Sequence, residues 1–310
     1  NALAEGITYR EAVGRGIAEA IETDDRVFIM GEDVGAYGGA YAVTKGFLDK
    51  YGEDRVKDTP ISESVIVGAG IGAAIDGLRP IVEIMTINFS LMAMDQIVNM
   101  AAKIRYMSGG QMSVPLVIRT VTGGGRQLGA THSQSLESWY ARVPGLRVVT
   151  PSTPYDSLGL FRSAMADPNP VIFVEHAVLY GTRGDVPGEP YSIPLGSADI
   201  KRAGGDVTLI AYSGMVPVAL EAAERLAMEG VSAEVVDLRS LAPLDTETVV
   251  SSVKKTHRAV VVEETWEFGG FSGEIAALLN EQAFDDLDGP VLRVGGANAP
   301  TPYSRHLEQA

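Results

Sequence analysis

The chain changes from polar to apolar at Lys57-Asp58-Thr59-Pro60-Ile61-Ser62-Glu63-Ser64, ahead of a glycine-rich segment that runs from Val65 to Gly77. The apolar run after Glu63 is typical of a buried element, so this carboxylate stands at the entrance to a protein interior. An unpaired charge in an apolar site is costly, so the group must find a partner or keep its proton. Glu63 is therefore a candidate for acid-base chemistry, with an ordinary carboxylate in the first turn of a helix as the structural alternative.

Short apolar runs and amphipathic runs alternate on both sides of this stretch. Thr8 and Glu11 have the spacing of a capping box, which predicts a helix from about Thr8 to Glu22. Ser90 is a candidate N-cap for a long helix that ends near Met107. The other elements predicted in this half are strands at 26–30, 79–85, 114–120, 146–150 and 170–175 and helices at 135–143 and 154–166. Such alternation favours a mainly parallel sheet with helices on both faces.

The segment between Gly181 and Gly196 interrupts this alternation with glycine, proline, aspartate and serine. Its prolines prevent regular strand pairing, so we expect a domain boundary here, with domains at 1–185 and 186–310. The second half alternates again, with predicted strands at 207–212, 233–237, 259–263 and 291–294 and helices at 217–229, 245–255 and 272–280. The expected fold class is α/β, with two doubly wound, mainly parallel sheet domains.

Composition narrows the possible partners. The 310 residues carry a formal net charge of −15, and no run of Lys or Arg is longer than the pair Lys254-Lys255, which argues against nucleic acid or an anionic membrane as a partner. The absence of cysteine rules out disulfides, thiolate nucleophiles and cysteine-ligated metals, and it fits a reducing compartment. The apolar runs are too short to span a bilayer. The chain begins at Asn1 rather than at Met, so we expect a processed N-terminus.

Two further side chains stand where predicted strands meet predicted helices. His132 follows the glycine loop Gly123 to Ala130, where backbone freedom lets a side chain face a ligand. Phe89 follows the strand that ends near Met85, at the edge where a parallel sheet binds ligands, and its ring can stack on a flat heterocycle. His176 is the next histidine candidate, and for all three the alternative is a purely structural role. No histidine pair has the spacing of a zinc site.

The run from Gly68 to Ala73 resembles a dinucleotide-binding fingerprint. However, Glu83 lies only ten residues beyond Ala73, whereas that fingerprint places its ribose-binding acid about 20 residues further on. The alternative is a helix whose small residues permit close packing against another helix or chain.

Ten short blocks, ordinary singly, occur together in a specific order. They are Gly31-Glu32-Asp33-Val34-Gly35, Asp58-Thr59-Pro60-Ile61-Ser62-Glu63, Gly77-Leu78-Arg79-Pro80, Asn88-Phe89-Ser90, Asp95-Gln96-Ile97, Tyr106-Met107-Ser108-Gly109-Gly110, His132-Ser133-Gln134-Ser135, Val143-Pro144-Gly145-Leu146, Asn169-Pro170-Val171 and Val236-Asp237-Leu238-Arg239. With these blocks the chain resembles, over essentially its full length, the beta subunits of thiamine-diphosphate-dependent 2-oxo acid dehydrogenases, closest to the pyruvate dehydrogenase type. The resemblance implies a pyrimidine-binding domain followed by a transketolase C-terminal-like domain.

The resemblance also implies roles for individual residues. Glu63 matches the glutamate that hydrogen-bonds the pyrimidine ring of thiamine diphosphate and so helps to remove the thiazolium C2 proton. Phe89 matches the aromatic residue that packs on the pyrimidine, and Met85 is expected to contact the cofactor as well. His132 matches an active-site histidine that handles protons and orients the lipoyl group during acetyl transfer. A potassium ion is expected mainly on backbone oxygens of four residues, Leu116, Ala164, Asp167 and Asn169.

One missing motif points to a partner. In this family the diphosphate and Mg²⁺ are bound through Gly-Asp-Gly followed by Asn-Asn, and the sequence contains neither. We therefore expect an alpha subunit to hold Mg²⁺ and the diphosphate in an alpha2-beta2 heterotetramer, which docks on a lipoyl-bearing acyltransferase core. The expected activity is decarboxylation of pyruvate and transfer of the acetyl group to a lipoyl group.

Four alternatives remain open from the sequence. Acetoin and branched-chain 2-oxo acid dehydrogenase beta subunits share most of the blocks. An NAD-dependent oxidoreductase would use Gly68 to Ala73, and a non-catalytic scaffold would use Glu63 and His132 only for packing. For the compartment we expect the bacterial cytoplasm, with the mitochondrial matrix or a plastid as alternatives.

Overall fold

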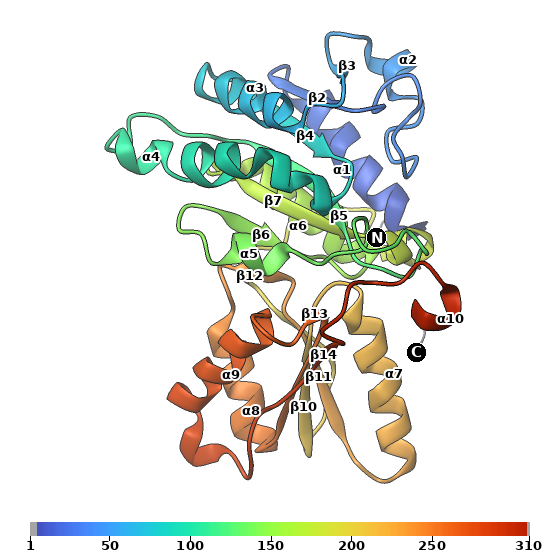
Figure 1. Ribbon diagram of the computed structural model, residues 1–310, viewed down its shortest axis with the longest axis vertical. Helices are drawn as coiled ribbons and strands as arrows, with labels where there is room; N and C mark the ends of the chain where they lie inside the picture. The colour runs from blue at the N-terminus through green and yellow to red at the C-terminus, as the bar shows by residue number, and fades with distance from the viewer. Residues whose placement is uncertain (1–4, 309–310) are drawn as a thin grey trace.

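Seven strands form the sheet of the first domain in the computed structural model, which describes residues 5–308 (Figure 1). In spatial order they are β12 (Ser240–Ala242), β6 (Arg147–Val149), β7 (Val171–His176), β5 (Val117–Thr122), β4 (Arg79–Ile84), β2 (Val27–Gly31) and β3 (Val56–Asp58). All neighbours pair in parallel except β12, which is antiparallel to β6. The parallel strands place their carboxyl ends, and the loops that follow them, at one edge of the sheet.

Helices cover both faces of this sheet. On one face α1 (Tyr9–Thr23) and α6 (Pro154–Ala166) bury Val13, Ile17 and Phe161 against the strands. On the other face α3 (Glu63–Ile75) buries Ile66 and Ile71. Two smaller helices are α2 (Phe47–Tyr51) and α5 (Glu137–Ala141). The layering confirms the predicted doubly wound α/β architecture.

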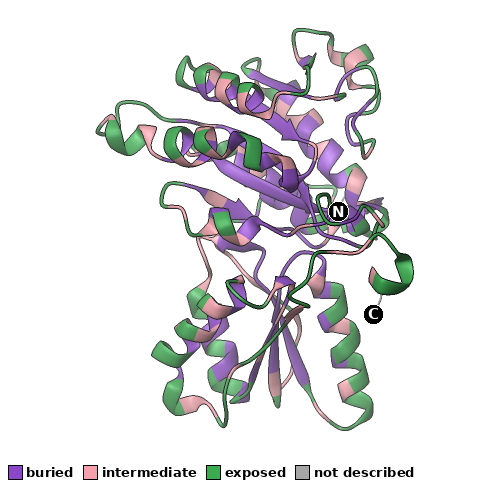
Figure 2. Ribbon diagram, in the orientation of Figure 1, coloured by how far each residue is buried: buried purple, intermediate pink, exposed green. Residues whose placement is uncertain are grey.

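The second domain repeats this layering on five strands. Their order is β14 (Leu292–Gly296), β13 (Ala259–Trp266), β10 (Val207–Ala211), β11 (Ala233–Asp237) and β9 (Asp199–Arg202), with β9 antiparallel to β11. The helix α7 (Met215–Met228) packs on one face, and α8 (Thr246–Thr256) and α9 (Phe271–Gln282) pack on the other. Figure 2 shows buried strands at the centre of both domains and exposed outer helix faces. Within residues 5–308, no helix is both long enough and apolar enough to cross a membrane.

The two domains are joined by a shared apolar core. One cluster of buried side chains contains Tyr140 and Val148 of the first domain together with Leu238 and Leu241 of the second. In addition, β12 comes from the second half of the chain but extends the first sheet. Two further strands, β1 (Glu5–Thr8) and β8 (Arg183–Val186), form a separate antiparallel pair. Because β8 spans the predicted boundary between residues 185 and 186, the position of that boundary stays a prediction.

The predicted long helix from Ser90 to Met107 is wrong. The chain instead forms a 3₁₀ turn at Ile87–Ala93, a π turn at Gln96–Ala101 and a short helix α4 (Ile104–Met107). Ser90 is not an N-cap, because its hydroxyl donates to the Ile87 carbonyl at 2.5 Å and lies 2.5 Å from the Tyr140 hydroxyl. A serine that bonds to the backbone three residues earlier competes with regular α-helical bonding, and here it lies inside the tighter turn.

Candidate active site

A pocket of about 560 Å³ opens at the carboxyl ends of β2 and β4. Glu32 follows β2 directly, and Met85 follows β4. The lining residues are Glu32, Ile61, Ser62, Glu63, Ser64, Met85, Phe89 and Met92. Ligands of parallel α/β sheets bind at this edge, so the pocket is the first candidate for the active site.

Glu63 is the first residue of α3 and lines this pocket. Its side chain is only half-buried, and within residues 5–308 the carboxylate has no hydrogen bond or ion pair with the protein. A carboxylate in a pocket wall without a protein partner is available to a ligand. The structure thus places Glu63 where a bound ring with a hydrogen-bonding nitrogen can meet it.

Glu32 is a second acid in the same pocket, and the sequence did not single it out as a site residue. Burial raises the pKa of the Glu32 carboxyl, and the nearby charges of Asp33 and Glu63 raise it further. Glu32 therefore holds a proton more tightly than an ordinary glutamate. No local motif could reveal this, because the two acids meet only when the end of β2 lies beside the start of α3.

Phe89 and His132 lie against each other at the rim of the pocket. Their ring centroids are 5.1 Å apart and the rings are nearly perpendicular, at 88°. The loop that carries His132 is tied to the same wall, because the Asn88 side-chain oxygen accepts from the backbone and side-chain nitrogens of Gln134, both at 3.1 Å. His132 itself is exposed, with Nδ1 2.8 Å from the Thr131 hydroxyl. Three of the predicted site residues, Glu63, Met85 and Phe89, share the pocket, and His132 borders it through Phe89.

His176 occupies a different place and has a structural role. It is buried at the end of β7, with Nε2 2.6 Å from the Glu264 carboxylate of β13. Its Nδ1 accepts the backbone N–H of Val178 at 3.3 Å. The Nδ1 acceptor role fixes the tautomer, and the Glu264 contact joins the first domain to the second.

The run Gly68 to Ala73 does not form a phosphate-binding turn. These residues lie inside α3, and a side chain at Gly70 would come within 2.7 Å of Val82 on β4. Glu83, the candidate ribose-binding acid, is buried and paired with Arg119. Gly70 therefore serves close packing against a strand of the same domain.

The pocket fits half of a thiamine cofactor. Phe89, Met85 and Met92 provide apolar walls for a flat ring, and Glu63 provides a hydrogen-bonding acid. The eight lining residues include two acids and no lysine or arginine. Such a lining suits a neutral pyrimidine ring and disfavours a diphosphate, which needs cationic or metal partners.

The four residues of the expected potassium site lie around the start of β5 and the end of α6. The Leu116 carbonyl accepts from Val171 N at 2.9 Å, and the Ala164 carbonyl accepts from Asp167 N at 3.3 Å. Asp167 Oδ1 accepts from the backbone and side-chain nitrogens of Asn169, both at 2.7 Å. Each carbonyl keeps a second lone pair, so the potassium site stays a prediction.

Comparison with known proteins supports the same two-domain architecture. The pyrimidine binding domain of transketolase matches residues 5–182, and the transketolase C-terminal domain matches residues 196–310. A split-gene transketolase, solved as an inactive beta4 tetramer, has a similar fold, with a TM-score of 0.78 and 24% identity over 95% of this chain and 91% of that one.

Curated relatives are much closer in sequence. The mitochondrial pyruvate dehydrogenase E1 component subunit beta-2 of Oryza sativa is 48% identical, over 100% of this chain and 83% of the relative. Subunit beta-1 of Arabidopsis thaliana is 49% identical, over 99% of this chain and 85% of the relative. The subunit beta of the bacterium Rhizobium meliloti is 47% identical, over 98% of this chain and 66% of the relative. The chain therefore belongs to the family of pyruvate dehydrogenase E1 component beta subunits.

Proposed function

We propose that this chain, together with an alpha subunit, decarboxylates pyruvate with thiamine diphosphate and passes the acetyl group to a lipoyl group. The observation that carries the proposal is the Glu63 carboxylate, which has no partner among the described residues and lies in a pocket walled by Phe89 and Met85. When bound, thiamine diphosphate supplies a thiazolium ring that takes up the electron pair left when a 2-oxo acid loses carbon dioxide.

Each site residue of this chain would have a separate role around the bound cofactor. Glu63 would hydrogen-bond a pyrimidine nitrogen and so influence where that ring holds its protons. Phe89 and Met85 would provide apolar contacts that hold the pyrimidine ring. His132 stands at the rim beside Phe89, where an imidazole can give or take a proton as the acetyl group moves to the lipoyl sulfur. In that transfer the lipoyl disulfide accepts the two electrons, and one of its sulfurs takes the acetyl group.

An alpha subunit would complete the site. None of the described residues that line the pocket is a cation for the diphosphate, and two large apolar lining residues are exposed, Ile61 by 75% and Met92 by 70%. Apolar surface of this kind marks a contact with another chain. The alpha subunit would hold Mg²⁺ and the diphosphate in an alpha2-beta2 heterotetramer that docks on a lipoyl-bearing core. Potassium at Leu116, Ala164, Asp167 and Asn169 belongs to the same proposal.

The compartment stays a prediction. Relatives named as mitochondrial and a relative from a bacterium match this chain at nearly the same identity. Our expectation is the bacterial cytoplasm.

The first test is Glu63→Gln in the complex assembled with the alpha subunit. Glutamine keeps the size of the side chain but removes the acid, so we expect decarboxylation of pyruvate to fall by about 100-fold or more. Glu53→Gln is the matched control, because Glu53 is exposed and lies outside the pocket. Unchanged decarboxylation by the Glu63 variant would refute the assignment.

A substrate panel tests the second part of the proposal. Pyruvate should be turned over with the highest kcat/KM among straight-chain and branched-chain 2-oxo acids and acetoin. A preference for acetoin or for a branched-chain acid would assign the chain to the acetoin or branched-chain 2-oxo acid dehydrogenases instead, while the proposed roles of Glu63 and Phe89 would stand.

A further inference from the structure

Residues 297–308 leave the second domain after β14 and return to the first domain. Figure 1 shows this segment running along the seam between the two domains and ending in α10 (Arg305–Glu308). Two hydrogen bonds fix its path. Trp266 Nε1 donates to the Ala299 carbonyl at 3.0 Å, and the Thr301 hydroxyl donates to the Ser133 carbonyl at 3.5 Å.

The segment meets the glycine loop of residues 123–130, which leads directly to His132. Four loop residues have left-handed backbone angles: Gly123 with φ +92°, Gly125 with φ +83°, Gln127 with φ 53° and Gly129 with φ +77°. Glycine adopts many conformations at little cost, so such a loop does not fix its own shape. Gln127 is not a glycine, and a strained residue persists only where its surroundings hold it. The conformation of this loop therefore depends on contacts from outside it.

Glu308 supplies the main contact. Its carboxylate accepts three hydrogen bonds, from Gly125 N at 2.8 Å, Gln127 N at 3.2 Å and Gln127 Nε2 at 2.8 Å. Burial alone would raise the pKa of Glu308, but these bonds outweigh it and lower the pKa, which keeps the carboxylate charged. A charged acceptor makes stronger hydrogen bonds to backbone N–H groups than a neutral one.

Other contacts of the second domain flank this one. Glu264 accepts from Gly124 N at 2.8 Å. The Tyr303 ring lies so close to Gly129 that a side chain there would come within 2.5 Å of it. The Gly129 carbonyl in turn accepts from His132 N at 3.2 Å. The contacts thus reach the backbone on both sides of His132, at Gly129 before it and, through Thr301, at Ser133 after it.

We infer that Glu308 is a positioning residue for acetyl transfer: it holds the loop of residues 123–130 in the shape that places His132 at the rim of the pocket. This inference rests on the proposed function, because it requires that His132 takes part in acetyl transfer. It also gives a reason why residues 297–308 fold back on the first domain.

The test uses the complex assembled with its alpha subunit and separates two half-reactions. Decarboxylation is followed with an artificial electron acceptor, and acetyl transfer is followed on a lipoyl-bearing domain. Because a small misplacement of a reacting group costs up to about 100-fold in rate, Glu308→Ala should slow acetyl transfer by about 10- to 100-fold and change decarboxylation little. Glu308→Gln keeps one acceptor oxygen and should be intermediate. Glu281→Ala, an exposed position on α9, is the matched control and should behave like the unchanged protein.

A double variant shows whether Glu308 acts through His132. If it does, Glu308→Ala added to His132→Ala should cause no further loss of acetyl transfer, whereas multiplying losses would overturn the inference. If Glu308→Ala transfers the acetyl group normally while His132→Ala is impaired, only the role of Glu308 is overturned and the proposed role of His132 stands. Normal transfer in His132→Ala would overturn the proposed role of His132 and this inference with it.

Hydrogen exchange provides a readout that does not depend on activity. The backbone amides of Gly125 and Gln127 donate to Glu308, so they should exchange faster in Glu308→Ala and little faster in Glu308→Gln. Unchanged exchange at these amides would show that Glu308 does not hold the loop.

Discussion

Glu137, the first residue of α5, is an acid whose protonation changes on folding. Its side chain is almost completely buried, and burial raises the pKa of its carboxyl to about 7. The hydroxyl of Thr122 donates to the carboxylate at 2.8 Å and lowers the pKa in part, while the charge of Glu264 raises it. Glu137 therefore titrates near neutral pH in the folded chain, at the seam between the domains.

Glu137→Gln should remove a pH dependence of stability. In an unfolded chain this carboxyl has a pKa near 4.5, so its contribution to stability is complete below that pH and is lost as the pH rises through about 7. A shift of this size corresponds to a free energy of unfolding on the order of 3 kcal/mol. The variant stays neutral at every pH, so its Tm relative to the unchanged protein should be higher at about pH 8 than at about pH 5. Glu281→Gln is the control, and an equal Tm difference at both pH values would contradict the prediction.

The sequence singled out site residues where a motif carries the signal. Glu63 and Phe89 stand in two of the blocks, Met85 was expected to contact the cofactor, and the three residues share one pocket, while their roles stay predictions. Glu32 and Glu308 were missed because their importance comes from contacts between distant segments. A carboxylate followed by a polar stretch looks like any surface acid until the fold places backbone amides or another acid beside it.

Among the elements, α3 offers two glycines that should respond in opposite ways. A side chain at Gly70 would lie 2.7 Å from Val82 and 3.1 Å from Leu116, so Gly70→Ala overpacks the core and should destabilise the chain by about 1–3 kcal/mol. A side chain at Gly72 meets nothing within 4 Å, so Gly72→Ala should gain about 0.5–1 kcal/mol from helix propensity. Urea unfolding of both variants measures the two effects. If both variants gained stability, helix propensity alone would decide the effect. If both lost stability, packing alone would decide it.

Elements with strong local signals were predicted well. The Thr8 capping box is present, with Thr8 Oγ1 accepting from Glu11 N, and α6 and β11 have their predicted bounds. The short strands β9 and β12 were not predicted, because each has only a few residues and forms through pairing with a distant strand. The region 90–107 was predicted as one helix because its composition suits a helix, while bonds such as that of Ser90 to Ile87 divide it.

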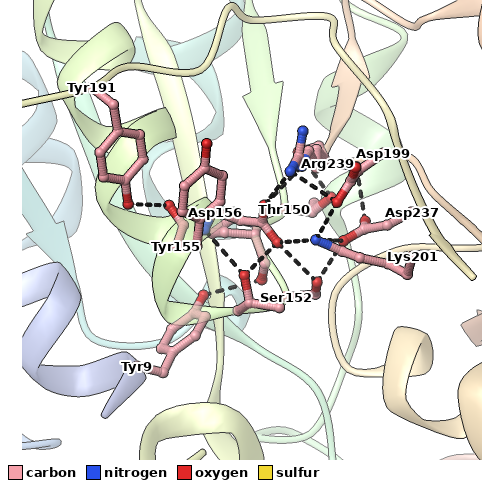
Figure 3. A network of polar contacts seen from close by, with 12 residues as sticks. Tyr9, Thr150, Ser152, Tyr155, Asp156, Tyr191, Asp199, Lys201, Asp237 and Arg239 are labelled. Atoms are coloured by element: carbon pink, nitrogen blue, oxygen red, sulfur yellow. Dashed lines mark hydrogen bonds and ion pairs between the residues drawn. The ribbon is translucent and has the colours of Figure 1, made fainter. Parts of the chain in front are cut away.

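At the scale of the whole molecule, a buried network of charges joins the two domains (Figure 3). Asp156 of α6 accepts from Lys201 of β9 and from Arg239, both at 2.7 Å. Asp237 lies 3.7 Å from Lys201, and Asp199 pairs with both cations at 2.8 and 3.0 Å. Burial raises the pKa of Asp237 to about 7, and the charge of Asp156 adds to this effect. Three acids thus share two cations, and the network holds one proton more easily than separate acids would.

Removing one cation should make the attachment of the domains strongly pH-dependent. Lys201→Met leaves the three acids with Arg239 alone, and breaking a buried ion pair in this way costs about 3–5 kcal/mol. Because the loss of a positive charge raises the pKa of the remaining acids, the variant should lose more stability at about pH 8 than at about pH 6. Lys254→Met is the control, since Lys254 pairs with Asp286 at the surface at 3.8 Å, where a pair contributes about 0–1 kcal/mol.

Adding Asp237→Asn to Lys201→Met should restore part of the stability at the higher pH, because it removes one of the unpaired charges. Thermal unfolding followed by circular dichroism measures all four proteins, and a loss in Lys201→Met that is the same at both pH values would show that charge balance does not hold the domains together.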